Sequence, residues 1–362
     1  MEKRIIINGR FLTQRITGVQ RYQYEMLLGI DYNLKDDCSQ YSFELLCPKG
    51  KLINIPKLKN IQIVQFGNLN GHLWEQIDLR RYKSDNKSIL ISLTASGPIY
   101  STDLVVIHDV VSPSRPRLEF DIIYKMWFKF KEKKLIDNAK TIITISNFSK
   151  KEILNNFSPK KSIQVIYEGY EHIDRIKEDN SILSRLNLQD KKFFFSLGTI
   201  KANKNIGLIL KAANKLKNYI FVITGGFNKK IFKSSNLNFD QLDNVIYTGY
   251  LKDEEIKTLY SNCEAFIFPS LYEGFGLPPL EARVCGANLI LSDIEPLREV
   301  YGNQAVYIDP YDENSLIETI MKRRYKEVNN NISDLKNKYS WLKNSKLILN
   351  EITKLIQKIL EK

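Results

Sequence analysis

The stretch Ala265-Phe-Ile-Phe-Pro-Ser-Leu-Tyr-Glu-Gly-Phe-Gly-Leu-Pro-Pro-Leu-Glu-Ala282 decides the fold of the C-terminal half of the chain. It begins with a short apolar run, Ala265–Pro269, which predicts a buried strand. Gly274 and Gly276 follow, and they allow the backbone to turn and to approach a ligand closely. Two prolines come next and suit the first turn of a helix, where a missing N–H costs nothing. The stretch therefore predicts a strand, a tight turn and a helix over Pro279–Cys285.

Short apolar runs alternate with segments of helical spacing along the rest of the chain. Because these runs are almost continuously apolar, they indicate parallel sheets that are covered on both faces. The predicted strands are Arg4–Asn8, Phe43–Cys47, Ile61–Phe66, Ile89–Leu93, Leu104–His108, Thr141–Ser146, Ile163–Tyr167, Phe193–Gly198, Tyr219–Thr224, Asn244–Tyr247, Ala265–Pro269 and Asn288–Leu291. The predicted helices are Val19–Ile30, Ile206–Leu216, Asp253–Asn262, Pro279–Cys285 and Leu335–Leu360.

A polar and charged stretch, Ile173–Gln189, separates two such alternating series and is interpreted as the domain connection. We therefore expect an N-terminal domain over residues 1–175 and a C-terminal domain over 176–343. The C-terminal helix, about 344–362, is expected to pack back on the first domain. The predicted fold class is α/β, with two Rossmann-like, doubly wound parallel-sheet domains that face a central cleft.

The composition is that of a folded protein, with 362 residues, 43% hydrophobic and 26% charged, and this excludes collagen-like and disordered chains. The four cysteines have no C-x-x-C spacing and only three histidines are present, which argues against a structural zinc site and a disulfide framework. The first residues do not resemble a signal peptide, and no run of about eighteen apolar residues occurs. These features together predict a cytoplasmic protein.

The formal net charge is +13 and the pI is near 9.3, which favours anionic partners. A lysine-rich composition of the source organism would give the same excess, so both interpretations stay open. Nucleic acid is the weaker choice of anionic partner, because neither a recognition helix nor a stacking platform is found in the sequence.

Two carboxylates, Glu273 and Glu281, lie eight residues apart around the predicted turn. The free N–H groups of the helix start, aided by the helix dipole, suit an anion. Carboxylates accept hydrogen bonds from sugar hydroxyls, so the combination suits a ligand with phosphate and several hydroxyls, such as a nucleotide sugar. The alternative is an ordinary strand–turn–helix with solvated glutamates.

At this point the sequence resembles the retaining nucleotide-sugar glycosyltransferases of family 4, which have the GT-B fold, because Glu273 and Glu281 match their E-x7-E signature. Five further segments are similar to landmarks of that family: Ile16-Thr-Gly-Val-Gln-Arg-Tyr22, Ile107-His-Asp-Val110, Ile145-Ser-Asn-Phe-Ser-Lys150, Phe195-Ser-Leu-Gly-Thr-Ile-Lys-Ala-Asn-Lys-Asn205 and Tyr247-Thr-Gly-Tyr-Leu-Lys-Asp-Glu-Glu255. The resemblance covers roughly the whole chain and is more diffuse before Leu104.

The resemblance implies a role for each matching residue. Glu281 would accept hydrogen bonds from the ribose, Glu273 would contact the transferred sugar, and Lys204 would neutralise the departing diphosphate. His108 would face the donor sugar from the other domain. The implied catalytic set is Glu273, Lys204 and His108, and the implied donor-binding set is Gly18, Val19, Thr199, Lys204, Gly274, Phe275, Gly276, Leu277 and Glu281.

The sequence departs from the family at Asn203, where an arginine often precedes the lysine; Lys201 is a weak substitute. Simpler interpretations also stay open: a solvated Lys204, a structural His108, and a Gly18 that only starts a helix.

The implied activity is retaining transfer of a hexose from a nucleoside-diphosphate sugar to a hydroxyl of a glycan or lipid-linked oligosaccharide. By resemblance, its context is bacterial surface polysaccharide, either O-antigen or capsule. No D-x-D motif occurs near a strand end, so we expect a metal-independent reaction with no cofactor besides the sugar donor. Donors preorganised at the leaving group would supply the largest catalytic effect.

The segment Ile122-Ile-Tyr-Lys-Met-Trp-Phe-Lys-Phe-Lys-Glu-Lys-Lys134 is basic and aromatic. On a helix, Lys125, Lys129 and Lys133 align at four-residue spacing, with Trp127 on a neighbouring face. This pattern suits binding in the plane of an anionic membrane. The alternative is a core-packing helix with a solvated lysine face.

Two rival classes of protein remain. A dehydrogenase or another sugar-nucleotide enzyme, such as an epimerase, is disfavoured because the G-x-G-x-x-G pattern is not found after the first strand. A non-catalytic subunit of a polysaccharide-assembly complex is disfavoured because Lys204, Glu273 and Glu281 are all present.

Overall fold

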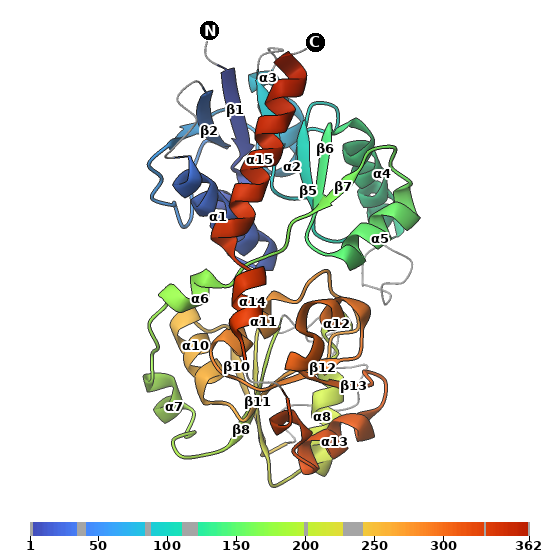
Figure 1. Cartoon of the computed structure of the whole chain (residues 1–362). Helices are drawn as coiled ribbons and strands as arrows, with labels where there is room; N and C mark the ends of the chain where they lie inside the picture. Colours follow the sequence, from blue (N-terminus) through green and yellow to red (C-terminus); the bar gives the residue numbers. More distant parts are fainter. Residues whose placement is uncertain are drawn as a thin grey trace. The chain divides into compact units, whose positions relative to one another are not determined.

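The computed structural model describes residues 3–34, 41–83, 88–110, 122–198, 202–226, 242–328 and 331–360. Over these residues the chain forms two compact units (Figure 1). Unit 1 takes its described residues from Met1–Ser112, Asp121–Gly169 and Tyr339–Lys362, and unit 2 takes them from Tyr170–Lys338. No helix among these residues combines the length and the apolar composition needed to cross a bilayer.

Unit 1 contains a parallel sheet of seven described strands in the order β3-β2-β1-β4-β5-β6-β7. The strand order reverses between β1 and β4, and such a switch point is where open α/β sheets bind ligands. The strands are β1 (Lys3–Asn8), β2 (Tyr41–Cys47), β3 (Ile61–Gln65), β4 (Ile89–Ser92), β5 (Leu104–Ile107), β6 (Thr141–Thr144) and β7 (Ile163–Val165). The helical segments are η1 (Arg10–Thr13), α1 (Gly18–Asn33), α2 (Gly71–Trp74), the π-helical η2 (Glu75–Leu79), α3 (Arg80–Tyr82), α4 (Ile122–Asn138), α5 (Asn147–Phe157) and α15 (Trp341–Leu360).

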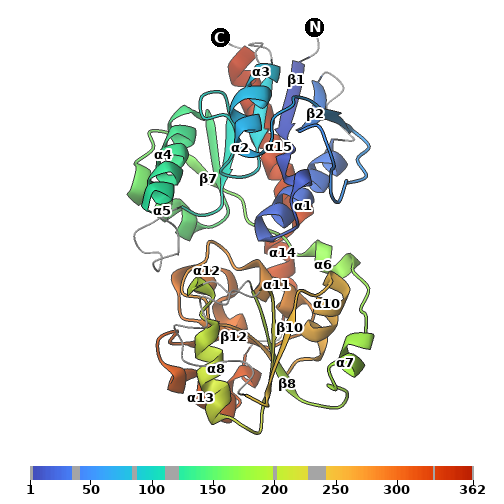
Figure 2. The same cartoon turned by 180° about the vertical axis from the view of Figure 1, so that it is seen from behind.

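Helices cover both faces of this sheet. Figure 1 shows α1 and α15 on one face, and Figure 2 shows α2 and α4 on the other. The C-terminal α15 packs against α1, where the Asn33 amide donates to the carbonyl of Leu342 at 3.1 Å and to Ser345 Oγ at 3.0 Å. Gly29 has no side chain at the point where Ser345 contacts α1, so the two helices approach closely.

Unit 2 contains a parallel sheet of six described strands in the order β10-β9-β8-β11-β12-β13, with its switch point between β8 and β11. The strands are β8 (Phe193–Leu197), β9 (Ile220–Thr224), β10 (Val245–Gly249), β11 (Ala265–Phe268), β12 (Leu289–Ser292) and β13 (Val306–Ile308). The helical segments are α6 (Glu171–Arg175), α7 (Ser181–Arg185), η3 (Ala202–Lys204), α8 (Ile206–Lys215), α10 (Asp253–Asn262), α11 (Leu277–Val284), α12 (Glu295–Tyr301), η5 (Gly302–Gln304), α13 (Glu313–Met321), η6 (Arg324–Lys326) and α14 (Ser333–Lys338).

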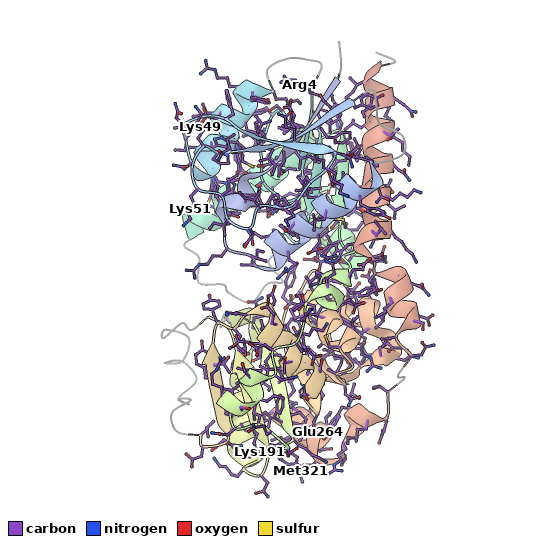
Figure 3. All side chains as sticks on the ribbon, turned by 90° about the vertical axis from the view of Figure 1, so that its left-hand side faces the viewer. Arg4, Lys49, Lys51, Lys191, Glu264 and Met321 are labelled. Carbon is purple, nitrogen blue, oxygen red and sulfur yellow. The ribbon has the colours of Figure 1, made fainter. Side chains whose placement is uncertain are left out.

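The direction of the strands fixes which edge of the unit 2 sheet carries the ligand-binding loops. Lys191 and Glu264 precede β8 and β11, and Figure 3 shows both at the same end of the unit. The carboxyl ends of the strands therefore lie at the opposite edge. β11 and β12 are buried along their whole length, which explains their continuous apolar runs and confirms the predicted parallel sheets.

The interpretation of Ile173–Gln189 as a connection is wrong, because α6 and α7 occupy much of it and belong to unit 2. Its polar side chains are engaged by α10: Arg185 pairs with Glu255 at 2.6 Å, and Lys257 donates to the carbonyl of Ile176 at 2.7 Å. The chain leaves unit 1 after Gly169, whereas the sequence placed this boundary after residue 175.

The predicted single helix over Leu335–Leu360 is also wrong. It is divided into α14 and α15, because the chain re-enters unit 1 at Tyr339, before the predicted boundary at 343. The hydroxyl of Ser340 accepts from the backbone N–H of Lys343 at 3.2 Å and so caps the start of α15.

Candidate active site

The switch point of unit 2 brings two of the predicted residues together. Lys204 ends the loop after β8, and Glu273 lies in the loop after β11, the neighbouring strand. The two loops are joined by a backbone hydrogen bond from Leu271 N–H to the carbonyl of Asn203 at 2.7 Å. Lys204 Nζ lies 2.5 Å from Glu273 Oε1, so the ammonium and the carboxylate form an ion pair at this edge of the sheet.

The surroundings of Lys204 orient its ammonium. The group lies 4.9 Å from the centre of the Phe268 ring, a cation–π contact that no sequence pattern indicated. The side chains of Lys204 and Glu273 are 19% and 13% exposed, so both are held in place yet reachable by a ligand. The side-chain oxygen of Asn203 is buried without a hydrogen-bond partner in the described part of the chain. The residue that precedes Lys204 in the chain thus carries a buried polar atom that a ligand donor would satisfy.

The glycine turn positions the start of α11. Gly276 has φ +92°, a conformation that favours glycine, and an added Cβ would lie 2.7 Å from Leu297 Cδ2. The Tyr301 hydroxyl donates to the carbonyl of Gly276 and fixes the turn. Pro278 and Pro279 follow Leu277 and have no backbone N–H groups. The backbone donors left at this helix start are therefore the N–H groups of the glycine turn and of Leu277.

Glu281 lies on α11 and makes two hydrogen bonds. Its Oε1 lies 2.7 Å from His172 Nε2, and its Oε2 accepts from the Tyr260 hydroxyl at 3.0 Å. Burial, together with the nearby Glu281 carboxylate, raises the pKa of Tyr260 well above its usual value, so this phenol stays a donor. Each carboxylate oxygen keeps a second lone pair for a ligand hydroxyl.

No sequence pattern marks His172, Tyr260 or Tyr301 as site residues. His172 precedes Glu281 by 109 positions, directly before the stretch interpreted as a connection, and its side chain is 3% exposed. Tyr260 falls on the apolar face of a predicted helix, where a tyrosine reads as ordinary core. Packing between helices brings His172 and Tyr260 to Glu281, and no local sequence pattern encodes that packing.

The unit 1 residues of the prediction lie at the carboxyl edge of its sheet. Gly18 and Val19 form the first turn of α1, which begins in a capping box between Thr17 and Gln20. Val19 is 37% exposed, and a Cβ added to Gly18 would meet no other described residue within 4 Å. The structure thus leaves this helix start accessible.

His108 follows β5 and is buried. Its Nε2 lies 3.1 Å from the Leu93 carbonyl and its Nδ1 lies 3.9 Å from Glu168, with the Tyr22 ring edge-on at 4.4 Å. Both ring nitrogens therefore face partners inside unit 1, as a structural histidine would.

A second polar cluster, which no sequence pattern indicated, lies at the switch point of unit 1. Glu75 is fully buried, and its carboxylate accepts from Asn8 Nδ2 at 2.9 Å and pairs with Arg10 and His72, each at 2.9 Å. Burial raises the pKa of Glu75, but the hydrogen bond from His72 and the charge of Arg10 outweigh it and lower the pKa to about 2. Lys131 is buried near Glu75, and burial lowers the pKa of its ammonium.

The basic aromatic segment forms α4. Trp127 and Phe130 stack at 6.0 Å and are 51% and 45% exposed, while Lys129 and Lys133 are also exposed. The side chain of Lys125 lies outside the described residues, as do Thr199 and Lys201. Within the described ranges, no three His, Cys, Asp or Glu side chains are arranged to hold a metal ion.

Comparisons with known proteins show which family and which enzymes the chain is similar to. Residues 178–330 match the family model described as glycosyl transferases group 1. The chain is 27% identical over 238 residues to the O-antigen chain mannosyltransferase RfbU of Salmonella typhimurium, covering 64% of both chains. It is 27% identical over 377 residues to the serotype-specific mannosyltransferase WbdA of Escherichia coli, covering 98% of this chain and 45% of WbdA. The chain thus spans 64% of the length of RfbU and 45% of the length of WbdA.

Solved structures share the fold. Sucrose-phosphate synthase from Thermosynechococcus elongatus superposes with a TM-score of 0.73 at 15% identity, covering 99% of this chain and 100% of that one. WaaG, a glycosyltransferase involved in lipopolysaccharide biosynthesis, superposes with a TM-score of 0.66 at 13% identity, covering 98% of both chains. The two Rossmann-like units therefore correspond to the GT-B fold.

Proposed function

We propose that the chain, whose residues 178–330 match the glycosyl transferases group 1 family, is a retaining glycosyltransferase. The proposed reaction moves a hexose from a nucleoside-diphosphate sugar to a hydroxyl of a glycan or lipid-linked oligosaccharide. The observation that carries the proposal is the pairing of Lys204 with Glu273 at the switch point of unit 2, followed by Glu281 on α11.

Each group is assigned to one part of the donor. Lys204 keeps donor positions beyond its contact with Glu273 and is assigned to the diphosphate. Glu273 is assigned to hydroxyls of the transferred sugar, and the backbone of Gly274, Phe275, Gly276 and Leu277 to the sugar and distal phosphate. Glu281, oriented by His172 and Tyr260, is assigned to the ribose hydroxyls.

The chemistry follows from where charge develops. Cleavage of the sugar–phosphate bond leaves negative charge on the diphosphate and positive character on the ring carbon. A preorganised ammonium and backbone N–H groups lower the energy of that anion, so the proposed reaction proceeds without a metal ion. The acceptor hydroxyl attacks from the face that the diphosphate leaves, and the departing phosphate takes its proton.

Four residues complete the assignment. Gly18 and Val19 are assigned to the diphosphate, because the accessible start of α1 offers backbone N–H groups for an anion. Thr199 is assigned to the same group from the family pattern. His108 is assigned to the donor sugar from the family pattern alone. Because its ring nitrogens face Leu93 and Glu168, the proposed role is positioning and not proton transfer.

The mannosyltransferase relatives support a biological setting for the proposal. RfbU is named an O-antigen chain mannosyltransferase and WbdA a serotype-specific mannosyltransferase, and these names support a role in synthesis of a bacterial surface polysaccharide, O-antigen or capsule. The proposed location of this synthesis is the cytoplasm. Because both relatives are named mannosyltransferases, a nucleoside-diphosphate mannose is the first donor to test.

The proposal is tested by binding of UDP, GDP and dTDP to the purified chain and by slow hydrolysis of their sugars without acceptor. Glu281→Ala is expected to weaken binding of the preferred nucleotide by about 1–3 kcal/mol, because charge-assisted hydrogen bonds to the ribose are lost. The measurement is isothermal titration calorimetry. Glu318→Ala, which removes a 55%-exposed carboxylate from α13, is the matched control.

Unchanged nucleotide affinity in Glu281→Ala would remove this residue from the site. Nucleotide binding without hydrolysis or transfer of any sugar would favour the non-catalytic subunit.

We also propose that α4 attaches the protein to an anionic membrane surface. The stacked Trp127 and Phe130 expose aromatic area, and Lys129 and Lys133 lie exposed on the same helix, a combination that suits the headgroup region. Lys134 Nζ lies 5.8 Å from the Phe130 ring and adds positive charge beside it.

Tryptophan fluorescence tests this attachment, because Trp127 is half exposed whereas Trp74 and Trp341 are buried. Vesicles of phosphatidylglycerol and phosphatidylcholine are expected to shift the emission to the blue, and Trp127→Phe to abolish the shift. Lys129→Gln with Lys133→Gln should raise the lipid concentration needed by roughly 30-fold, at about 1 kcal/mol for each lysine. An unshifted wild-type emission would contradict the proposal.

A further inference from the structure

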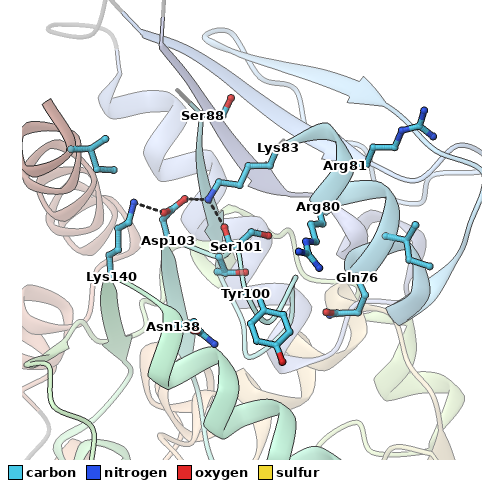
Figure 4. Close-up of a pocket in the computed structure, with 13 residues that line it drawn as sticks. Gln76, Arg80, Arg81, Lys83, Ser88, Tyr100, Ser101, Asp103, Asn138 and Lys140 are labelled. Carbon is cyan, nitrogen blue, oxygen red and sulfur yellow. Dashed lines mark hydrogen bonds and ion pairs between the residues drawn. The ribbon is translucent and has the colours of Figure 1, made fainter. Parts of the chain in front are cut away.

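A pocket of about 750 Å³ opens at the amino-terminal edge of the unit 1 sheet. Ser88, Asp103 and Lys140 line it, and these residues directly precede β4, β5 and β6 (Figure 4). The residues assigned to the donor follow strands, so in unit 1 this pocket lies at the other edge of the sheet from Gly18 and His108. It is therefore a separate site.

The charge of the pocket is strongly positive. Asp103 has a buried carboxylate that pairs with Lys83 and, at 2.9 Å, with Lys140, and it also accepts from the backbone N–H of Leu90 at 2.9 Å. One negative charge thus holds two ammonium groups in place. Arg80 and Arg81 also line the pocket, so its charged side chains sum to +3.

The two arginines are not neutralised by the protein over the described ranges, where neither forms an ion pair. The Arg80 guanidinium lies 6.0 Å from the centre of the Tyr100 ring, and Figure 4 shows it extending from its helix toward that ring. Tyr100 is itself 57% exposed. A guanidinium group that pairs with no carboxylate presents its fork of N–H donors to an anion with several oxygens.

Ser101 adds a hydrogen-bonding group that the described residues leave unused. Its Oγ is buried without a hydrogen-bond partner among them, although it lines the pocket. Its backbone carbonyl, by contrast, accepts from Lys83 Nζ at 2.5 Å. A buried hydroxyl costs free energy unless it is hydrogen-bonded, so a ligand oxygen would satisfy it.

We propose that this pocket binds a phosphate-bearing ligand. A phosphate brings three or more acceptor oxygens and up to two negative charges, which match the arginine fork, the two lysines and the Ser101 hydroxyl. The exposed Tyr100 ring gives the remainder of the ligand an apolar surface. The phosphate comes from a soluble phosphomonoester or from a lipid headgroup, and the test below separates these two sources.

The test measures binding of glucose 1-phosphate by calorimetry and of phosphatidylglycerol–phosphatidylcholine vesicles by sedimentation, each with the full-length chain. Saturating nucleoside diphosphate is present, so that the proposed donor site is occupied. Arg80→Gln with Arg81→Gln is expected to weaken binding of one probe by about tenfold or more. Lys49→Gln with Lys51→Gln removes the same charge from an exposed loop of unit 1 (Figure 3) and should change the affinity less than about twofold.

The response of each probe assigns the source. If the arginine variant loses affinity for glucose 1-phosphate alone, the ligand is a soluble phosphomonoester. If it loses affinity for the vesicles alone, the ligand is a lipid headgroup. Equal binding of both probes to the arginine variant and to the lysine control would overturn the proposal. Because Arg80 and Arg81 have no assigned part in the donor site, the arginine variant should hydrolyse nucleotide sugars at the wild-type rate. A failure of the pocket and a failure of the proposed glycosyltransferase activity are thus separately visible.

Discussion

Lys204→Ala is expected to lower kcat for sugar transfer by about 10²–10³-fold, the usual effect of removing one preorganised donor from a developing anion. The ammonium is held at the switch point by Glu273 at 2.5 Å and by the Phe268 ring at 4.9 Å, so it needs little reorganisation during the reaction. Nucleotide affinity should fall much less than kcat, because the negative charge at the leaving group increases in the transition state. Steady-state kinetics with the preferred donor and acceptor measure both effects.

Lys211→Ala is the matched control for Lys204→Ala. Lys211 lies on α8, the helix that follows Lys204, and its side chain is 56% exposed at 3.9 Å from Glu313. This variant should retain wild-type kcat, since exposed ion pairs contribute little. If Lys204→Ala kept more than about a tenth of the wild-type kcat, another group would have to carry the leaving-group role.

The sheets could be predicted from the sequence because burial on both faces forces continuous apolar runs. β11 and β12 are such runs and were found. β13 was not, because its three residues, Val306–Ile308, are too few to show a period. α6 and α7 were missed because they are short, polar helices whose residues are held by contacts with α10 and α11.

The candidate site could be predicted as far as it depends on chain order. Lys204 and Glu273 each follow a strand, and the doubly wound topology makes those strands neighbours. The contact between His172 and Glu281 depends on how α6 packs on α11, which local patterns do not encode. The same holds for Glu75, which lies among the polar residues Gln76 and Asp78 and therefore resembles a solvated carboxylate until its burial is known.

Glu75→Gln is expected to destabilise unit 1 by about 3–4 kcal/mol at neutral pH, because removing one member of a buried charged cluster leaves the others uncompensated. Arg10, His72 and Asn8 all direct their nitrogens at this carboxylate. The substitution keeps the shape of the side chain, so the loss reports charge and hydrogen bonding and not a cavity. Urea unfolding followed by tryptophan emission measures it, since Trp74, Trp127 and Trp341 all lie in unit 1. Asp137→Asn, at a 41%-exposed carboxylate of the same unit, is the control.

The pH dependence of this effect follows from the lowered pKa of Glu75, about 2 in the folded protein against an ordinary value of 4.5. A carboxyl whose pKa is lowered on folding stabilises the protein above its unfolded pKa and loses that contribution as pH falls through its folded pKa. The difference between wild type and Glu75→Gln should therefore be largest above pH 4.5 and shrink by about 3 kcal/mol between pH 4.5 and 2. A difference that stayed constant over that range would show that the glutamine acts through packing, and that the Glu75 charge does not stabilise the switch point of unit 1.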